Sequence, residues 1–468
     1  MITIYLDWSV MAQMKNGLLP DLVKVLQAER FLIPYSTSHI GDILSGYNKD
    51  SKQKSYTDSD FEFITDISRN YCLANDSKKI NLTISDPKEL LNKRVDEVDI
   101  LKDFSLDKIT EILDGDERTK ELGKIWVDLL KSIPLDKAFT DAFNNPESSK
   151  HMEVLFPGLK DNPTIEGYFK SFGEMINRMN GNEDYKELRK VTQSGLGINR
   201  DEIFNSSDPY SLIKKTYDKF KFHPKSFFQK DKYGPEWFNE ISNEYIRLDM
   251  HGYQEDRVKT GKGRKETFKN TTEDAFHAAF ASTCNFYIVS DNRAYHKTLM
   301  VYEQLKLNTL VFKPHEFQNH YKDFLFERAE NIHVEIPIKY LEIGDFKESA
   351  IEDGILRTCH LPYFVFDFFN KMYVFYNKTG RITSIMLGQL GPSNKKITYY
   401  FEIQKLSPKL FKAFGQDVEG LGEIKTEELE QVDWVGRKWN FGRISFRFIR
   451  LSGHYQLYYD VNEEHSTK

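Results

Sequence analysis

Four aspartates are the residues of this sequence that are best placed for chemistry. Asp7 ends the apolar run ITIYL, and Asp291 comes two residues after the apolar run FYIV. Asp42 and Asp274 lie in segments with a helical pattern. Because open α/β sheets carry their sites at the carboxyl ends of parallel strands, we expect Asp7 and Asp291 to share that edge.

Carboxylates that are gathered into one pocket repel each other, and such a group persists when a cation neutralises it. All-oxygen ligands favour Mg²⁺ or Mn²⁺ with several waters retained. We therefore expect Asp7 and Asp291 to bind the metal directly, and Asp42 and Asp274 to bind it directly or through water. Side chains close to these aspartates could orient ligands or phosphate oxygens, in the case of the serines, or transfer protons, in the case of the histidines: Ser9, Ser36, Ser290, His39 and His277.

Each of these residues also has an ordinary structural interpretation. Asp7 and Asp291 could cap the helices that follow their strands. Asp274 could be the acidic half of a capping box that begins at Thr271. His277, beside two alanines, could be a packing histidine with satisfied hydrogen bonds. These interpretations do not explain why all four acids belong near one sheet edge.

The elements around the aspartates alternate between strand and helix. This alternation predicts a parallel sheet with helical crossovers. Strands are expected at 2–6, 31–35, 286–289 and 309–312. Helices are expected from residue 10 onward, at 20–29, after 36–38 in a segment that carries His39 and Asp42, at 275–282 and at 294–306.

Four segments in this order resemble the motifs of the PIN-like nuclease family. They are YLDWS at 5–9, PYSTSHIGDI at 34–43, DAFHAAFAS at 274–282 and FYIVSDNRAY at 286–295. The resemblance covers roughly residues 1–45 and 271–317, and it places the four family acids on Asp7, Asp42, Asp274 and Asp291. Membership would imply a metal-dependent phosphodiesterase that acts on RNA.

The tract between Asp42 and Asp274 is much longer than the family pattern. Its mostly helical character predicts an α/β, PIN-like domain (1–50 and 247–325) split by a helical insertion (51–246). The tract also leaves Asp60 or Glu62 as alternatives to Asp42. Residues 330–468 predict a separate β-rich C-terminal domain with a hairpin turn at 377–380 and one helical excursion; strand-like runs are expected at 363–369, 372–376, 397–403, 444–449 and 455–459.

Composition sets broad limits on the class of protein. At 468 residues the chain is long enough for two or three domains, and its net charge of -6 excludes a generally basic nucleic-acid binder. Three widely separated cysteines fit a reducing compartment. The sequence has no apolar run of membrane-spanning length and no basic region before its first apolar stretch, so we expect a cytoplasmic protein with no membrane partner.

Two stretches could guide a nucleic acid to the aspartates. The glycine-containing segment 259–269 is cationic and could bind phosphates, or it could be an ordinary solvated loop. Its basic residues are Lys259, Lys262, Arg264, Lys265 and Lys269. Segment 217–238 interleaves lysines with aromatic residues, a composition that suits single-stranded nucleic acid but that packing explains as well.

The sequence therefore predicts a Mg²⁺- or Mn²⁺-dependent endoribonuclease that acts on single-stranded RNA. By analogy alone, a conditional role such as a toxin or anti-phage effector is expected, with an inhibitor or partner protein, or self-association, as compatible partners. Two alternatives stay open at this point. One is a PIN-like scaffold that binds nucleic acid or protein without cleaving, and the other is a DNA-directed nuclease that uses the same site.

Overall fold

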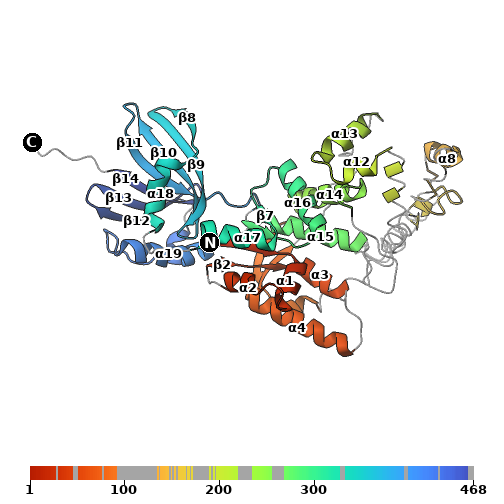
Figure 1. Ribbon diagram of the computed structural model, residues 1–468, viewed down its shortest axis with the longest axis horizontal. Helices are drawn as coiled ribbons and strands as arrows, with labels where there is room; N and C mark the ends of the chain where they lie inside the picture. Colours follow the sequence, from red (N-terminus) through yellow and green to blue (C-terminus); the bar gives the residue numbers. More distant parts are fainter. Residues whose placement is uncertain are drawn as a thin grey trace, which may run out of the picture.

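The computed structural model describes two structured parts of the chain, an α/β part and a C-terminal β-rich part (Figure 1). The described residues are 1–27, 30–45, 51–75, 78–91, 197–219, 234–255, 268–326, 332–394, 399–430 and 433–461, with short pieces between 134 and 194. Within them, no helix has both the length and the apolar character that crossing a membrane requires.

A four-stranded, fully parallel sheet organises the α/β part. Its order is β2-β1-β6-β7, so the first strand of the chain lies beside a strand that begins more than 280 residues later. Ile4 pairs with Phe286, and Leu6 pairs with Ile288. The expected parallel sheet is confirmed. The strands are β1 (Ile2–Leu6), β2 (Phe31–Leu32), β6 (Phe286–Ile288) and β7 (Leu310–Phe312).

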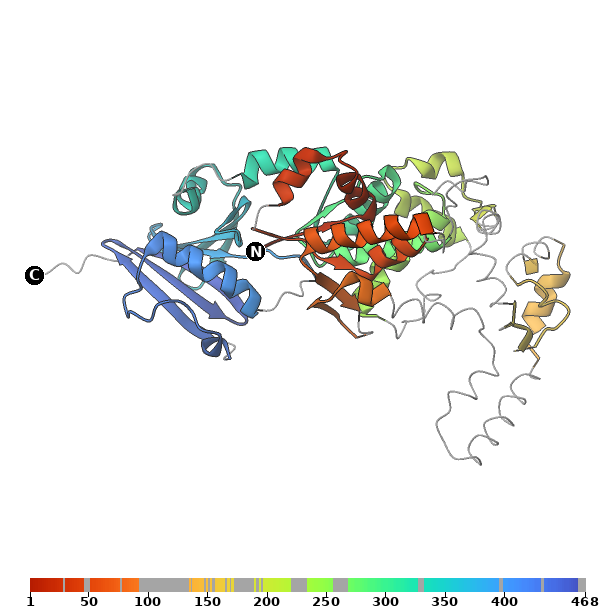
Figure 2. The ribbon, with the colours of Figure 1, turned by 90° about the horizontal axis from the view of Figure 1, so that it is seen from below.

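Helices cover both faces of this sheet, because alternate strand residues point to opposite sides. Ile4 and Leu6 belong to one apolar core, whereas Tyr5 belongs to the other. The first core is closed by α1 (Trp8–Lys15), α2 (Pro20–Leu26), α3 (Thr37–Ser45), α4 (Ser51–Ser68), α17 (Pro314–His320) and η3 (Tyr321–Leu325). The second is closed by α14 (Glu236–Met250), α15 (Phe268–Ala281) and α16 (Asn292–Gln304). Figure 2 shows α4 in front of the sheet.

Residues 51–91 differ from the expected helical insertion. They form α4 and then β4 (Tyr71–Asn75) and β5 (Ile80–Ile84), which make a small sheet in the order β3-β4-β5 with β3 (Tyr35–Ser36). Phe61, Ile64 and Cys72 lie in the first core, so this stretch is part of the α/β domain. The helices described further along the tract are α8 (Lys137–Asn144), α12 (Arg200–Phe204) and α13 (Pro209–Lys219). Residues 92–133 of the expected helical insertion lie outside the described residues.

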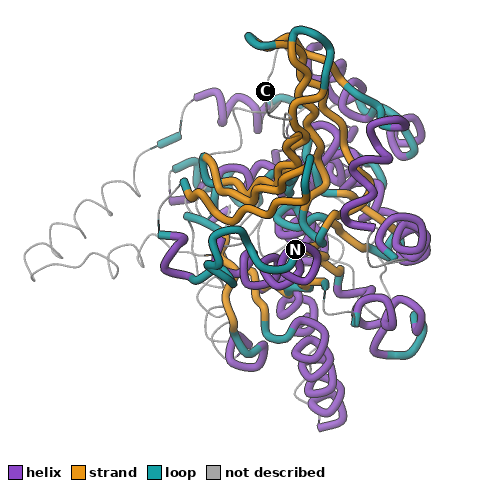
Figure 3. Tube along the Cα trace, turned by 90° about the vertical axis from the view of Figure 1, so that its left-hand side faces the viewer, coloured by secondary structure: helices purple, strands orange, loops and turns teal. Residues whose placement is uncertain are grey.

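The C-terminal part is a seven-stranded antiparallel sheet, as expected, in the order β12-β13-β14-β11-β10-β9-β8. In Figure 3 this part lies nearest the viewer. Its strands are β8 (Lys347–Ile351), β9 (Gly354–Val365), β10 (Phe369–Asn377), β11 (Ile382–Gly388), β12 (Trp434–Phe441), β13 (Ile444–Leu451) and β14 (His454–Val461). The turn expected at 377–380 is present, with Gly380 in the left-handed region (φ 79°).

Two helices, not one, accompany this sheet, and one of them replaces an expected strand. They are α18 (Ile332–Ile343) and α19 (Tyr399–Phe414), and a short 3₁₀ helix, η4, spans Thr426–Leu429. The run 397–403 is therefore not a strand, and the prediction there was wrong. Ile403, Leu406, Leu410 and Phe414 recur at helical spacing, and burying that stripe in the C-terminal core favours a helix.

The C-terminal part docks on the amino edge of the parallel sheet. Phe364 packs against Phe286, the first residue of β6, with ring centroids 5.8 Å apart. Asp367 forms an ion pair with Arg30, which comes just before β2. Ser393 accepts a hydrogen bond from the backbone N–H of Asn308, just before β7 (3.1 Å). The carboxyl edge, where Asp7 and Asp291 lie, faces away from these contacts.

Candidate active site at the carboxyl edge of the parallel sheet

Asp7 and Asp291 both follow strands of the parallel sheet, and both cap the next helix. Asp7 accepts a hydrogen bond from the backbone N–H of Ser9 at the start of α1 (3.0 Å). Asp291 accepts hydrogen bonds from the backbone N–H groups of Arg293 and Ala294 at the start of α16 (2.8 and 2.9 Å). Asp7 is buried and Asp291 is exposed. Capping alone therefore accounts for one oxygen of each carboxylate.

The carboxyl group of Asp7 lies in surroundings that disfavour its ionised form. Burial raises the pKa of this carboxyl, His277 and the hydrogen bonds from Ser9 oppose that rise, and the nearby charge of Asp42 adds to it. A buried carboxylate with a second carboxylate close by favours either a proton or a bound cation. Asp7 and Asp42 therefore lie close enough for the charge of Asp42 to act on Asp7.

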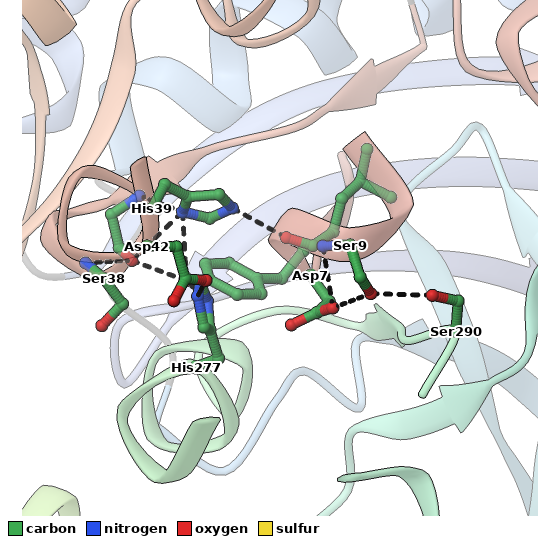
Figure 4. A network of polar contacts seen from close by, with 10 residues as sticks. Asp7, Ser9, Ser38, His39, Asp42, His277 and Ser290 are labelled. Atoms are coloured by element: carbon green, nitrogen blue, oxygen red, sulfur yellow. Dashed lines mark hydrogen bonds and ion pairs between the residues drawn. The ribbon is translucent and has the colours of Figure 1, made fainter. Parts of the chain in front are cut away.

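Asp42 is anchored by a chain of buried polar groups (Figure 4). Its Oδ2 lies 3.0 Å from Nε2 of His277, and Nδ1 of His277 lies 2.8 Å from the hydroxyl of Tyr5. The same hydroxyl lies 2.6 Å from Oγ of Ser36. His277 and Tyr5 are fully buried, whereas the Asp42 side chain is 20% exposed. The chain fixes the rotamer of a carboxylate whose remaining surface reaches solvent.

His277 lies between Asp42 and Tyr5 in this chain. Burial alone would lower its pKa, but the hydrogen bond and charge of Asp42, with the charges of Asp7 and Glu273, raise the pKa above its ordinary value. Burial raises the pKa of Tyr5 well above its usual range, so this hydroxyl stays protonated. An imidazolium between two aspartates offsets part of their repulsion.

His39 has a different state in the same network. Its Nδ1 accepts a hydrogen bond from the backbone N–H of Ser36 (3.0 Å), and its Nε2 donates to the carbonyl of Leu6 (2.8 Å). Burial, and then the charge of His277, lower the pKa of His39 well below its ordinary value. The neutral ring therefore ties α3 to the end of β1, and both of its nitrogens are engaged.

A close approach of two helices places His277 beside Asp42. Gly41 of α3 faces Glu273 of α15, and a Cβ at position 41 would overlap the carboxylate of Glu273. Any larger residue at position 41 would therefore require the Glu273 side chain to move. Asp274 lies three residues before His277 in α15, is half-buried, and contributes its charge to the surroundings of Tyr287. Because α15 begins at Phe268, Thr271 is not the N-cap that the sequence suggested.

Ser9, Ser290 and Gln13 form a second polar group beside Asp7. Ser9 donates its hydroxyl to Asp7, and its oxygen lies 2.7 Å from Oγ of Ser290. Gln13 donates to Oγ of Ser290 (2.8 Å). Hydroxyls from the ends of β1 and β6 thus meet next to a buried carboxylate, where the sequence placed Ser9 and Ser290.

Lys313 is a cation at this edge that the sequence reasoning missed. Its Nζ donates to the carbonyl of Ser290 (2.8 Å) and lies 4.9 Å from the ring centroid of Tyr295. Burial lowers the pKa of Lys313, against the charges of Asp291, Glu316 and Asp7. The signal was available, because Lys313 directly follows β7 and strand ends of a parallel sheet meet at one edge.

The described residues do not form the four-acid cluster that the resemblance implied. Among them, no group of three or more His, Cys, Asp or Glu side chains is arranged to hold a metal ion. The pair Asp7 and Asp42, with neighbouring hydroxyls, is nevertheless a donor set that fits Mg²⁺, which often binds one or two carboxylates and keeps several waters. Of the alternatives to Asp42, Asp60 forms an ion pair with Lys15, and Glu62 is exposed on α4.

The predicted phosphate-binding residues of segment 259–269 lie outside the part of the chain whose side chains the structure describes. They are Lys259, Lys262, Arg264, Lys265 and Lys269. Most of the aromatic and basic stretch 217–238 lies outside it as well.

Comparisons of the chain with models of protein families, with curated proteins and with solved structures gave no match. The assignment of a function therefore depends on the geometry and chemistry of the site.

Proposed function

We propose that the protein is a Mg²⁺- or Mn²⁺-dependent endoribonuclease whose site is the carboxyl edge of the parallel sheet. The observation that supports this most strongly is the pairing of Asp7 and Asp42. The first carboxylate is buried, and the charge of the second makes its ionised form still less favourable. A divalent cation would offset that cost, and phosphodiester hydrolysis is the chemistry that such a site serves.

In this proposal Asp7 and Asp42 hold the ion, which when bound lowers the pKa of a water molecule and neutralises charge on the phosphate. Tyr5 and His277 position Asp42 by the hydrogen bonds described above. Ser9 and Ser290 offer hydroxyls to substrate oxygens. The charge of Lys313 at the same edge attracts the phosphate backbone.

A non-catalytic scaffold is the second candidate, and one observation favours it. The Asp291 carboxylate already caps α16, and Lys313 lies close enough to neutralise it, so this acid has a structural role without any metal. A DNA-directed nuclease would use the same groups, because metal-activated water does not need the 2′-hydroxyl. A conditional role as a toxin or anti-phage effector remains part of the proposal.

The test is a cleavage assay on labelled single-stranded RNA and DNA with Mn²⁺. It compares the wild type with Asp7→Asn and with Asp21→Asn as a matched control, because Asp21 is 79% exposed on α2. We expect RNA cleavage by the wild type and the control, and loss of cleavage together with weaker Mn²⁺ binding by calorimetry in Asp7→Asn.

Three other results would change the assignment. Equal cleavage by all three proteins would trace the activity to a contaminant and contradict the proposed site. Binding of RNA by all three without cleavage at any metal concentration would favour the scaffold. Faster cleavage of DNA than of RNA would show that the substrate is DNA, and the proposed site would stand.

A further inference from the structure

The seven-stranded C-terminal sheet has two unlike faces. On the inner face, residues such as Val374, Leu387 and Phe448 are buried against α18 and α19 in the C-terminal core. Their neighbours along each strand point to the opposite face, which we call the outer face. Directly paired residues form one row across the outer face, from β12 to β8: Lys438, Arg447, Tyr458, Met386, Tyr373, Thr358 and Lys347.

Aromatic rings occupy the middle of the outer face. Tyr373 and Phe375 lie on β10, about 7 Å apart along the strand, and Tyr458 lies on β14. All three are half-buried, and none belongs to the C-terminal core or packs against it. A Cβ on Gly388 would lie 3.2 Å from Cε2 of Tyr373, so the tyrosine ring lies over a residue that has no side chain. These rings rest on the sheet and are partly exposed to solvent.

Cations lie over two of the rings, those of Tyr373 and Tyr458, and a stacked base would take the place of these cations. Nζ of Lys371 is 4.9 Å from the ring centroid of Tyr373, and the Arg447 guanidinium is 4.7 Å from that of Tyr458. Asp460 forms an ion pair with Arg447, so the lysines of this face are the groups left to meet phosphates. His360 of β9 lies opposite Lys371 of β10 in the strand register. Burial, together with the charges of Lys371 and Lys347, lowers the pKa of His360. The end of the face near β8 therefore carries two lysines, Lys371 and Lys347, close to a neutral His360.

We propose that the outer face binds single-stranded nucleic acid, with bases stacked on Tyr373, Phe375 and Tyr458 and phosphates paired with Lys371 and its cationic neighbours. Open aromatic rings on a sheet, flanked by basic side chains, suit unpaired bases, which present a π-face whatever their sequence. The positive charge complements a polyanion and opposes a basic partner. Because a duplex hides its base faces, this surface should discriminate against double strands. The proposal does not depend on nuclease activity.

The experiment measures the binding of fluorescently labelled oligouridylate, oligothymidylate and an RNA duplex to the full-length protein by anisotropy in EDTA, so that no cleavage occurs. The variants are Tyr373→Ala, Phe375→Ala and Lys371→Gln. Tyr400→Ala serves as the aromatic control, because Tyr400 is 42% exposed on α19, and Lys24→Gln as the lysine control, because Lys24 is 78% exposed on α2.

We expect single strands to bind in preference to the duplex, and each aromatic variant to weaken binding roughly 5- to 150-fold. Lys371→Gln should reduce the slope of log K against log salt by about 0.7, the value for one phosphate contact on a single strand. Both controls should bind like the wild type. Equal binding of RNA and DNA strands also supports the proposal, because stacking on an aromatic ring involves the base and not the sugar.

The proposal fails if single strands do not bind, if the duplex binds more tightly, or if the three outer-face variants bind like the controls. Circular dichroism of each variant separates lost binding from lost folding, and Lys371→Gln tests the face without removing any packed ring. Because Asp7→Asn in the Mn²⁺ cleavage assay tests the site at the other domain, each proposal can fail without the other.

Discussion

The hydroxyl of Tyr5 bonds His277, which in turn bonds Asp42 of the candidate site. Removal of this hydroxyl is the sharpest test of the buried network. Tyr5→Phe keeps the ring within its core and deletes one oxygen. That oxygen bonds Oγ of Ser36 (2.6 Å) and Nδ1 of His277 (2.8 Å), both in fully buried surroundings. Two buried polar atoms therefore lose a partner in one substitution.

The size of the effect follows from the number of bonds. A hydrogen bond contributes about 0.5–1.5 kcal/mol net, and a buried polar group left unsatisfied costs about 1–3 kcal/mol. For Tyr5→Phe we expect a loss of about 2–4 kcal/mol in the free energy of unfolding. Tyr302→Phe is a matched control, because Tyr302 is a buried tyrosine on α16 whose hydroxyl donates to the carbonyl of Ala278. That carbonyl also accepts from the N–H of Ser282, so this control should lose only about 1 kcal/mol.

Urea unfolding followed by circular dichroism, with wild type and both variants at the same pH, measures the difference. The unfolding midpoint should fall further for Tyr5→Phe than for Tyr302→Phe, with unchanged slopes. An equal or smaller fall for Tyr5→Phe would refute the view that this hydroxyl organises the network. If the nuclease proposal also holds, Tyr5→Phe should lower cleavage more than RNA binding, because His277 then holds Asp42 less firmly.

The other predictions concern three aspartates. Asp7→Asn in EDTA should be as stable as the wild type or more stable by about 1 kcal/mol, because it removes a charge buried beside Asp42; a large loss of stability by urea unfolding would contradict this. Asp291→Asn should keep the helix cap and change stability by less than about 0.5 kcal/mol, while Mn²⁺-dependent cleavage falls at least about tenfold by the logic of a shared metal edge. Burial alone would raise the pKa of Asp367, but its cationic partners, Arg30 foremost, hold it below the ordinary value. The depressed folded-state pKa stabilises the protein above about pH 4, and this contribution is lost as pH falls through the lower value. Asp367→Asn should therefore cost about 3 kcal/mol near pH 7, and this cost should shrink progressively as the pH falls below about 4, as measured by urea unfolding at each pH.

The parallel sheet and its order of elements could be predicted because apolar runs followed by polar residues mark buried strands. The positions of Asp7 and Asp42 followed from that pattern. The role of Asp291 did not, since capping a helix and binding a metal require the same residue at the same place. The sequence gives no distance between two such acids.

The polar network was harder to predict. Tyr5 sits in an apolar strand, and only the alternation of strand residues puts its hydroxyl on the side of α15. Ile397–Ile403 is rich in β-branched and aromatic residues, which favoured a strand, although the helical spacing of Ile403, Leu406 and Leu410 was also present. In this segment, burial of the apolar face of a helix outweighed the local preference for a strand.

The C-terminal part attaches at the amino edge of the parallel sheet, and this position determines how long a nucleic acid must be to contact both domains at once. β1 is five residues long, so the aspartates lie about 17 Å from the opposite rim of their sheet at about 3.3 Å per residue. An oligonucleotide anchored on the C-terminal rings would have to traverse at least that thickness before reaching Asp7. Very short strands could then occupy one location or the other, and only longer ones would join the two.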